Sequence, residues 1–422
     1  MFTRFSSLPW LPCILAGALA ARMAAAVVVQ HWVERTPGRL CLIEGDASGY
    51  WQLARHVVRG EDFSIYVPPR YVERMPGFPL LLAAGMKLVG ERLLWIRMLL
   101  AVVGTAACGL VYCLGRELFN PTIGLVACFL ASVSPVFIVF SVLFLSETFF
   151  ALGLLSSLLA LVKFVQIETQ PGSIASPRRL PGLAAIAGLL AGAATLIRPT
   201  WILVAPVFAV IYLVAPGARK ARLVPAALVL AALGLALAPW TIRNYRITGH
   251  FVPTTLWVGP SLYDGLSPQA TGVSDMQFVE TDGLYKRPGM SEYDNDRHYR
   301  RLAFDFVKAH PLRTFELAGI KLGRYWSPVP NAEQLGQWAI RLGVGLFELP
   351  VLLLAAAGLW RTRGSPAKWL VSAGPVLYFA LVHAVFVGSV RYRLPAEYAL
   401  LILTAVGIRW MGRKSKPTED VT

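Results

Sequence analysis

Apolar runs of about 20 residues recur along this chain, and they constrain its fold more than any other feature. The hydrocarbon core of a membrane is roughly 30 Å thick and offers the backbone no water partner, so each such run is typical of a spanning helix. The chain has 422 residues, is 56% hydrophobic and 15% charged, and has a mean hydropathy of +0.56. This composition excludes an ordinary soluble globular protein.

The sequence therefore predicts an all-α polytopic membrane protein with about ten transmembrane helices. We expect them at residues 10–30, 95–116, 122–142, 145–165, 182–198, 200–215, 223–242, 337–360, 369–388 and 394–410. The fifth and sixth are short and meet at the sequence LIRPTW. Pro199 favours a turn there, because a proline disfavours helical geometry in the residue before it.

The formal net charge of +16 indicates a membrane topology rather than a nucleic-acid partner. Basic residues gather in the short loops on one side and in the tail: Arg116, Arg178, Arg179, Arg219, Lys220, Arg222, Arg361, Arg363, Lys368, Arg413, Lys414 and Lys416. The positive-inside rule makes that side the cytoplasm. We expect an integral inner (plasma) membrane protein with both termini inside, a transmembrane domain over residues 1–410 and a basic cytoplasmic tail over 411–422.

Two long segments, 31–94 and 243–336, then fall on the outer, periplasmic or extracytoplasmic side. In the first, Asp46 is placed to cap an amphipathic helix that Gly60 ends and that would lie on the membrane surface. The following run LLLAAGMKLVG is too short to span and is better interpreted as a second surface or re-entrant helix.

The second outer segment is soluble in character at its centre. It predicts a helix from about Ser291 to Lys308 and then a basic amphipathic helix over residues 314–325. This last helix would return the chain to the membrane surface, with Lys321 and Arg324 available to anionic headgroups.

Ionisable residues from separate parts of the chain reach the outer face in this topology. They are Asp46, Glu73, Arg74, Glu147, Arg198, Arg243, Arg246, Arg391 and Arg393. Arginine binds phosphate in bidentate fashion and stays charged, while a carboxylate with restricted water access can accept a proton from an attacking hydroxyl. Such a set suits group transfer from a lipid phosphate to an acceptor hydroxyl or amine.

Each of these residues also has a purely structural interpretation. Asp46 can serve as a plain helix cap, and Glu147 in FLSETFF can belong to a helix start. Arg198 and Arg243 can extend to lipid headgroups beside Pro199 and Pro239. The five cysteines form no disulfide framework, and the sequence has no CxxC or histidine cluster with zinc spacing, so it assigns no metal site.

The order of short motifs resembles the polytopic GT-C glycosyltransferases, in particular the bacterial proteins grouped with protein O-mannosyltransferases, aminoarabinose transferases and lipopolysaccharide-core sugar transferases. The motifs are GDASGYWQLAR, ERMPGFPLLLA, LSETFF, LIRPTW, PWTIRNYRITGHFVP and RYRLPAEYALLIL. The resemblance covers nearly the whole chain. It implies a GT-C architecture, a polyprenyl-phosphate-linked sugar as donor, an acceptor on the outer side, and usually inversion at the anomeric carbon.

By position, the resemblance also implies roles for individual residues. Asp46 matches the acidic residue of the first outer loop that activates the acceptor as general base, and Glu147 matches a second acidic residue. Glu73 and Arg74 match an acidic and basic pair near the donor phosphate. The remaining phosphate or headgroup contacts would be Arg198, Arg243 and Arg391.

One position departs from the family pattern. Many members carry two acidic residues in the first-loop motif, whereas Ala47 follows Asp46 here. This weakens the case for a divalent cation, and it leaves open whether Glu44 takes the second acidic position. We expect no certain cofactor.

We therefore expect a membrane glycosyltransferase whose acceptor is a lipid, a glycan or a protein. The alternative is a non-enzymatic transporter, or flippase, for lipid-linked sugars. A flippase would need charged residues along a path through the bundle, whereas this sequence places its charges mainly at one face.

Overall fold

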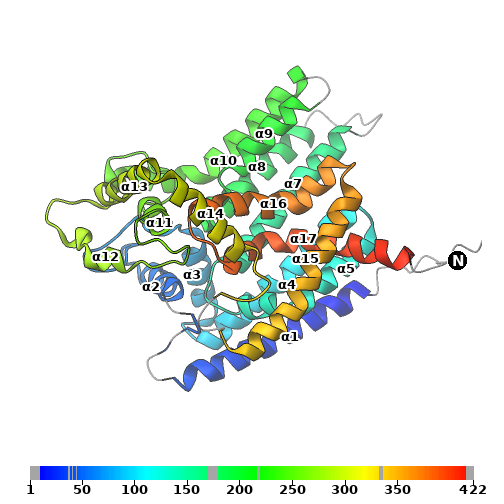
Figure 1. Ribbon diagram of the computed structural model, residues 1–422, viewed down its shortest axis with the longest axis horizontal. Helices are drawn as coiled ribbons and strands as arrows, with labels where there is room; N and C mark the ends of the chain where they lie inside the picture. Colours follow the sequence, from blue (N-terminus) through cyan, green and yellow to red (C-terminus); the bar gives the residue numbers. More distant parts are fainter. Residues whose placement is uncertain are drawn as a thin grey trace, which may run out of the picture.

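The computed structural model describes residues 10–36, 39, 41–43, 45–169, 179–215, 219–331 and 336–414, and this part of the chain is helical (Figure 1). Its first half contains α1 (Trp10–Glu34), α2 (Asp46–Arg59), α3 (Gly77–Val89), α4 (Leu93–Leu118), α5 (Pro121–Val133), α6 (Pro135–Phe140), α7 (Glu147–Thr169) and α8 (Arg179–Ile197). Its second half contains η1 (Pro199–Trp201), α9 (Val204–Val214), α10 (Arg219–Thr248), α11 (Val258–Gly265), α12 (Gln277–Thr281), η2 (Leu284–Lys286), α13 (Glu292–Ala309), α14 (Pro311–Tyr325), α15 (Trp338–Thr362), α16 (Pro366–Val385) and α17 (Val390–Lys414).

Eight helices in the described ranges are long and apolar enough to cross a membrane, judged by length and composition. They are α1, α4, α7, α8, α10, α15, α16 and α17. Each corresponds to one of the spans expected from the sequence. The prediction of an all-α polytopic membrane protein is confirmed, and the expected number of about ten spans agrees approximately with this count.

The other two expected spans are shorter helices. The run at 122–142 is interrupted between α5 and α6, where Ser134 leaves helical geometry and its hydroxyl accepts a hydrogen bond from the Phe137 backbone nitrogen at 3.4 Å. Pro135 then occupies the first turn of α6, a position that suits its fixed φ and missing N–H. The run at 200–215 begins with the 3-10 turn η1 and continues only as the short α9.

Helix α17 is the centre of the bundle. It packs against α4, α5, α7, α15 and α16. Its approach to α15 depends on two glycines: a Cβ atom on Gly358 would lie 2.0 Å from the Leu403 carbonyl oxygen, and one on Gly407 would lie 2.1 Å from the Leu354 carbonyl oxygen. Small residues at such contacts let helix backbones approach closely, which is how membrane helices gain packing energy without a hydrophobic driving force.

The helices of the two outer segments gather at one end of the molecule, where Figure 1 shows α2 and α3 beside α11, α12, α13 and α14. Helix α2 ends as expected, because Gly60 adopts a φ of 72° and its backbone N–H reaches the carbonyl oxygens of His56 and Val57. The two segments are joined by Glu292 at the start of α13, whose carboxylate accepts hydrogen bonds from the backbone nitrogens of Tyr71 at 2.9 Å and Val72 at 3.0 Å.

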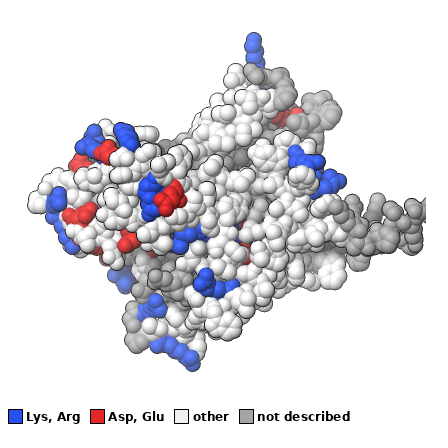
Figure 2. All heavy atoms as spheres, in the orientation of Figure 1, with Lys and Arg blue, Asp and Glu red and all other residues white. Residues whose placement is uncertain are grey.

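Charged side chains follow this division. In Figure 2 they gather over the α11–α14 end and near the far ends of α15 and α16, while the surface between is mainly uncharged. An uncharged band between two charged ends is what a lipid bilayer requires of a spanning bundle.

Helix α14 differs from the sequence-based expectation. Its Lys321 is fully buried, and its ammonium donates to the carbonyl oxygens of Val385 at 2.7 Å and Ala384 at 3.4 Å. The Arg324 guanidinium donates from Nε to the Gly388 carbonyl oxygen at 3.1 Å. The prediction that Lys321 faces lipid headgroups was wrong, because this side chain closes the end of α16, where carbonyl oxygens lack helical partners.

Candidate functional site

A chain of alternating charges crosses the end of the bundle where α2 and α3 lie. It joins side chains from five separate parts of the sequence, in the order Arg70, Glu73, Arg74, Asp46, Arg391, Glu147 and Arg198. Four arginines and three carboxylates therefore form one network, which we call the outer ion chain after the side expected for it from the sequence. Six of its members are among the seven site residues expected from the sequence, and the seventh, Arg243, is not a member.

Asp46 is the first residue of α2. Its Oδ1 accepts from Nη1 of Arg74 at 2.6 Å, and its Oδ2 lies 2.9 Å from Nη2 of Arg391. The expected capping role was wrong, because Gly45 occupies the N-cap position and the helix has no side-chain cap. A carboxylate in the first turn still benefits from the positive end of the helix dipole, but its hydrogen-bonding capacity is used by the two arginines.

Glu147 is the first residue of α7 and is almost fully buried. Its Oε1 accepts from Nη1 of Arg198 at 2.9 Å and from Nε of Arg391. The other carboxylate oxygen, Oε2, has no hydrogen-bond partner among the residues that the structure describes. Arg391 thus connects Asp46 to Glu147 through two nitrogens of one guanidinium.

Arg70 completes the other end of the chain and was not expected from the sequence. Its Nη1 donates to Oε2 of Glu73 at 2.9 Å, and its guanidinium lies 3.8 Å from the ring centre of Tyr285 and 4.5 Å from that of Tyr66. An arginine inside a loop gives no periodic signal, and one of the rings that it stacks on, Tyr285, lies more than 200 positions away in the sequence. Its stacking on aromatic faces is typical of arginine in partly dehydrated sites.

Arg243 does not join the outer ion chain. Its guanidinium donates to the carbonyl oxygens of Phe63 and Tyr71, each at 3.0 Å, and stacks 4.7 Å from the Trp240 ring centre. These contacts brace the first outer segment against α10. Glu44, the alternative second acidic residue, lies outside the described residues.

The electrostatics of the chain favour its charged state. Burial alone would raise the pKa of Asp46, but Arg74, Arg391 and Arg198 outweigh it and hold the pKa of this carboxyl well below its usual range. Burial would likewise lower the pKa of Arg74, and the carboxylate of Asp46 keeps it above its ordinary value instead. In this resting arrangement Asp46 is ionised and a weak base.

Arg391 is one of the residues that line a cavity of about 480 Å³. The walls of this cavity are mainly apolar and come from α1, α6, α15 and α17, with Val29, Phe140 and Val344 as examples. Its polar lining residues include Asn331, Gln337, Ser389 and Arg391. A mainly apolar space with an arginine in its lining matches the chemistry of a lipid with an anionic head.

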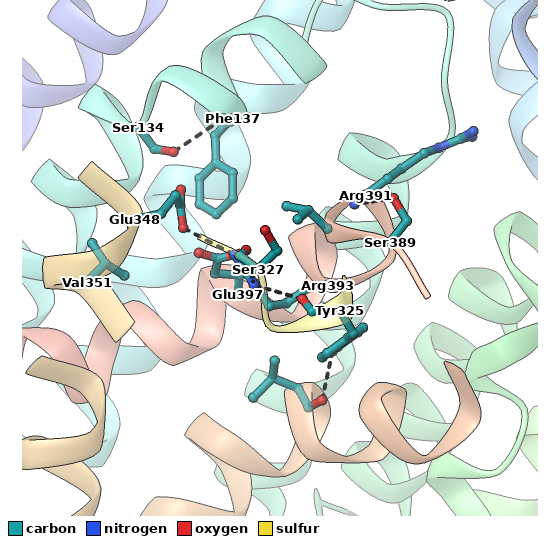
Figure 3. Close-up of polar contacts among 12 residues, drawn as sticks. Ser134, Phe137, Tyr325, Ser327, Glu348, Val351, Ser389, Arg391, Arg393 and Glu397 are labelled. Carbon is teal, nitrogen blue, oxygen red and sulfur yellow. Dashed lines mark hydrogen bonds and ion pairs between the residues drawn. The ribbon is translucent and has the colours of Figure 1, made fainter. Parts of the chain in front are cut away.

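A buried triad supports the start of α17 (Figure 3). Arg393 is fully buried and lies 2.8 Å from Oε2 of Glu397 and 3.4 Å from Oε2 of Glu348. Its Nη1 also donates to the carbonyl oxygens of Tyr325 at 2.8 Å and Ser327 at 3.1 Å. Because Arg393 is two residues from Arg391, this triad fixes the turn that carries the central arginine of the outer ion chain.

The carboxylates of the site are engaged by arginines rather than grouped around a vacant centre. Within the described ranges, no group of three or more histidine, cysteine, aspartate or glutamate side chains is arranged to hold a metal ion. The ion chain itself can bind an anion by exchange: a phosphate that enters would compete with the carboxylates for the same guanidinium groups.

Part of the chain is similar in sequence to a known family. Residues 73–242 match the family described as dolichyl-phosphate-mannose-protein mannosyltransferase. No curated protein sequence is significantly similar to the chain.

Solved structures of the archaeal oligosaccharyltransferase AglB from Archaeoglobus fulgidus share the fold. With an inhibitory peptide and a dolichol-phosphate bound, AglB has a TM-score of 0.62 and 16% identity, over 98% of this chain and 51% of its own. Its apo form has a TM-score of 0.60 and 15% identity, over the same shares. The chain thus spans about half the length of these proteins.

ArnT from Cupriavidus metallidurans bound to undecaprenyl phosphate has a TM-score of 0.44 and 15% identity, over 96% of this chain and 78% of its own. Because the TM-score of ArnT is lower than that of AglB, the comparison of folds rests on AglB. Residues 73–242 are thus similar to this mannosyltransferase family, and the chain as a whole shares the fold of AglB.

Proposed function

We propose that the chain is a membrane glycosyltransferase that moves a sugar from a polyprenyl-phosphate donor to an acceptor on the outer side of the membrane. The observation that carries this proposal is the position of Arg391, which lines the apolar cavity and also joins two carboxylates of the outer ion chain. In this proposal the cavity takes the part of the polyprenyl tail next to the phosphate, and the phosphate contacts Arg391. AglB, which has this fold, is known in complex with a dolichol-phosphate.

The donor phosphate would change the state of Asp46. When the phosphate accepts hydrogen bonds from Arg391 and Arg74, these guanidinium groups stabilise the Asp46 carboxylate less. The pKa of Asp46 then rises toward the ordinary range. The carboxylate can then accept the proton of the acceptor hydroxyl as that oxygen attacks the anomeric carbon. Asp46 would thus become an effective base only once the donor is bound.

The arginines would also stabilise the departing phosphate. As the bond between the anomeric carbon and the phosphate oxygen breaks, negative charge grows on that oxygen. Guanidinium groups that are already oriented by Glu147 and Asp46 can receive it with little reorganisation. In this proposal Arg391, Arg74 and Arg198 contact the phosphate. Glu147 orients Arg391 and Arg198, and Glu73 orients Arg74.

The same placement supports an assignment of the two membrane sides. The basic loops that the sequence assigns to the cytoplasm include Arg361 and Arg363 at the end of α15, whereas the outer ion chain lies beside α2 at the other end of the molecule. We infer that the site faces the periplasmic or extracytoplasmic side and that both termini are cytoplasmic. The acceptor would be a lipid, glycan or protein that reaches the outer segments.

Charges inside the bundle do not line a path between the two membrane faces in the described structure. The fully buried Arg22 donates to the carbonyl oxygens of Ala18, Ala131 and Ser132, and Arg393 is held by two glutamates. These groups pin helices together, which supports an enzyme over a flippase.

The test is the substitution Asp46→Asn in the full chain, with Asp62→Asn at an exposed position of the same outer segment as matched control. We expect both variants to insert and accumulate normally. Mass spectrometry of envelope lipids, glycans and proteins should show one sugar mass lost in the Asp46 variant, as in cells lacking the gene, and retained in the control. A retained sugar mass in the Asp46 variant would remove Asp46 as the base.

A further inference from the structure

A second, smaller cavity lies at the Arg70 end of the outer ion chain. Its volume is about 110 Å³, and its walls come from the loop between α2 and α3 and from the α12–η2 region. Its polar and aromatic lining residues are Tyr66, Arg70, Glu280, Tyr285 and Lys286. We call it the Arg70 pocket. It is separate from the apolar cavity that Arg391 lines.

The floor of the Arg70 pocket is polar and buried. Arg70 is 8% exposed and Tyr285 is 7% exposed. In the part of the chain that the structure describes, Nε of Arg70 and the hydroxyl of Tyr285 have no hydrogen-bond partner. Buried polar groups are nearly always paired, since leaving one unpaired costs about 1–3 kcal/mol. Two unpaired atoms on residues that line one cavity indicate a ligand that supplies their partners.

The backbone holds this loop in one conformation. Ile65 and Arg70 form an isolated antiparallel bridge, with backbone nitrogen to oxygen distances of 3.1 Å and 2.8 Å. Tyr66 has a φ of 71°, a left-handed conformation that is uncommon for a bulky residue. The Tyr66 ring lies 4.5 Å from the Arg70 guanidinium, and the buried Tyr285 ring lies 3.8 Å from it.

The charges of the pocket are balanced. Arg70 is paired with Glu73 at 2.9 Å, and Lys286 is paired with Glu280 at 3.5 Å on the exposed rim. A free anion or cation would therefore find no uncompensated charge. Tyrosine rings beside planar, charged hydrogen-bonding groups suit instead a neutral ligand with an apolar face and hydroxyl groups at its edge.

We propose that the Arg70 pocket binds one neutral sugar ring. The pocket is too small for a drug-sized molecule, for which cavities of about 300–1,000 Å³ are usual, and it suits a single ring. Its place in catalysis rests on the proposed function: through Glu73 and Arg74 the pocket is connected to Asp46. The sugar ring is either the terminal ring of the acceptor or the ring carried by the donor.

The test uses the substitution Tyr285→Phe, which removes only the unpaired hydroxyl. Its matched control is Tyr299→Phe, because Tyr299 belongs to the same aromatic cluster but its hydroxyl donates to Asp282 at 3.2 Å. The full chain is purified in lipid nanodiscs. Saturation-transfer NMR measures binding of the methyl glycosides of mannose, glucose, galactose and arabinose, and thermal unfolding is followed in parallel.

We expect at least one glycoside to bind the wild type, and Tyr285→Phe to weaken it by about fivefold to tenfold, as for one lost hydrogen bond, without lowering the unfolding temperature. Tyr299→Phe should lower the unfolding temperature and leave the affinity unchanged. No binding to the wild type, or equal affinity in the Tyr285 variant, would overturn the proposal. This readout needs no turnover, so it can fail while the proposed transfer activity stands, and the converse also holds.

A competition arm identifies the source of the ring. If the donor's sugar occupies the pocket, a polyprenyl-phosphate sugar displaces the bound glycoside and polyprenyl phosphate alone does not. If the acceptor's sugar occupies it, the glycoside stays bound in the presence of either lipid. Displacement by polyprenyl phosphate alone would contradict both, because it would place an anion in a charge-balanced pocket.

Discussion

Replacement of Arg391 tests the outer ion chain at the point where one side chain pairs with two carboxylates, those of Asp46 and Glu147. In Arg391→Gln the guanidinium is lost, so Glu147 keeps only Arg198 and Asp46 keeps only Arg74. In Arg391→Lys the charge remains, but a single ammonium nitrogen replaces the two guanidinium nitrogens that contact the two carboxylates. The pair of variants separates the need for charge from the need for geometry.

The magnitudes follow from burial. The side chain of Arg391 is 19% exposed and that of Glu147 is 2% exposed. Breaking a buried ion pair costs about 3–5 kcal/mol, and the remaining Arg198 should reduce this to about 2–3 kcal/mol in the free energy of unfolding. Losing one preorganised donor to a developing oxyanion lowers kcat by about 10²- to 10³-fold, which we expect for Arg391→Gln. Arg391→Lys should fall between the wild type and the glutamine variant.

The assay is cleavage of a polyprenyl-phosphate sugar by purified protein in nanodiscs, with thermal unfolding of the same samples. Arg55→Gln is the control, because Arg55 lies on α2 but pairs only with Glu91, at 2.9 Å on the partly exposed surface, where a pair contributes about 0–1 kcal/mol. A folded Arg391→Gln protein that cleaves the donor within about threefold of the wild-type rate would refute the role of Arg391.

Three further outcomes follow from other contacts. Burial raises the pKa of Glu292 to about 7, so the folded state keeps a proton that the unfolded state loses. Stability should therefore fall as the pH rises from about 4.5 to 7, by on the order of 3 kcal/mol, and Glu292→Gln should flatten this slope in unfolding scans. Arg243→Gln should cost about 2–4 kcal/mol in unfolding while turnover per folded molecule is kept, because its two carbonyl partners become unpaired. Arg393→Met should cost about 3–5 kcal/mol, and the triple replacement of Arg393, Glu348 and Glu397 by apolar residues should restore unfolding stability.

The amino-acid sequence contains enough to predict which residues meet at one end of the bundle. Each expected member of the ion chain follows or precedes a long apolar run, and the alternation of spans brings these ends to one level. Asp46, Glu73, Arg74, Glu147, Arg198 and Arg391 meet for this reason. Their roles in transfer stay a prediction.

The errors have local physical causes. Arg243 was grouped with the site because it ends a span, but carbonyl oxygens of the first outer segment compete for it. Hydropathy alone does not detect the break before Pro135, although a serine followed by proline is a helix-start signal. Arg70 also stacks on Tyr285, and Arg393 also pairs with Glu348. These two partners lie far along the chain, and no spacing rule connects them in the sequence.

The central claim is that this chain breaks the bond between a sugar and a polyprenyl phosphate at its outer face. The most direct measurement uses proteoliposomes that carry polyprenyl-phosphate hexoses and pentoses labelled in the sugar, and it follows both leaflet location and bond cleavage. We predict release of polyprenyl phosphate at the outer face, lost in Asp46→Asn and Arg391→Gln. Label that moves between leaflets with every donor intact would contradict the account and identify a flippase.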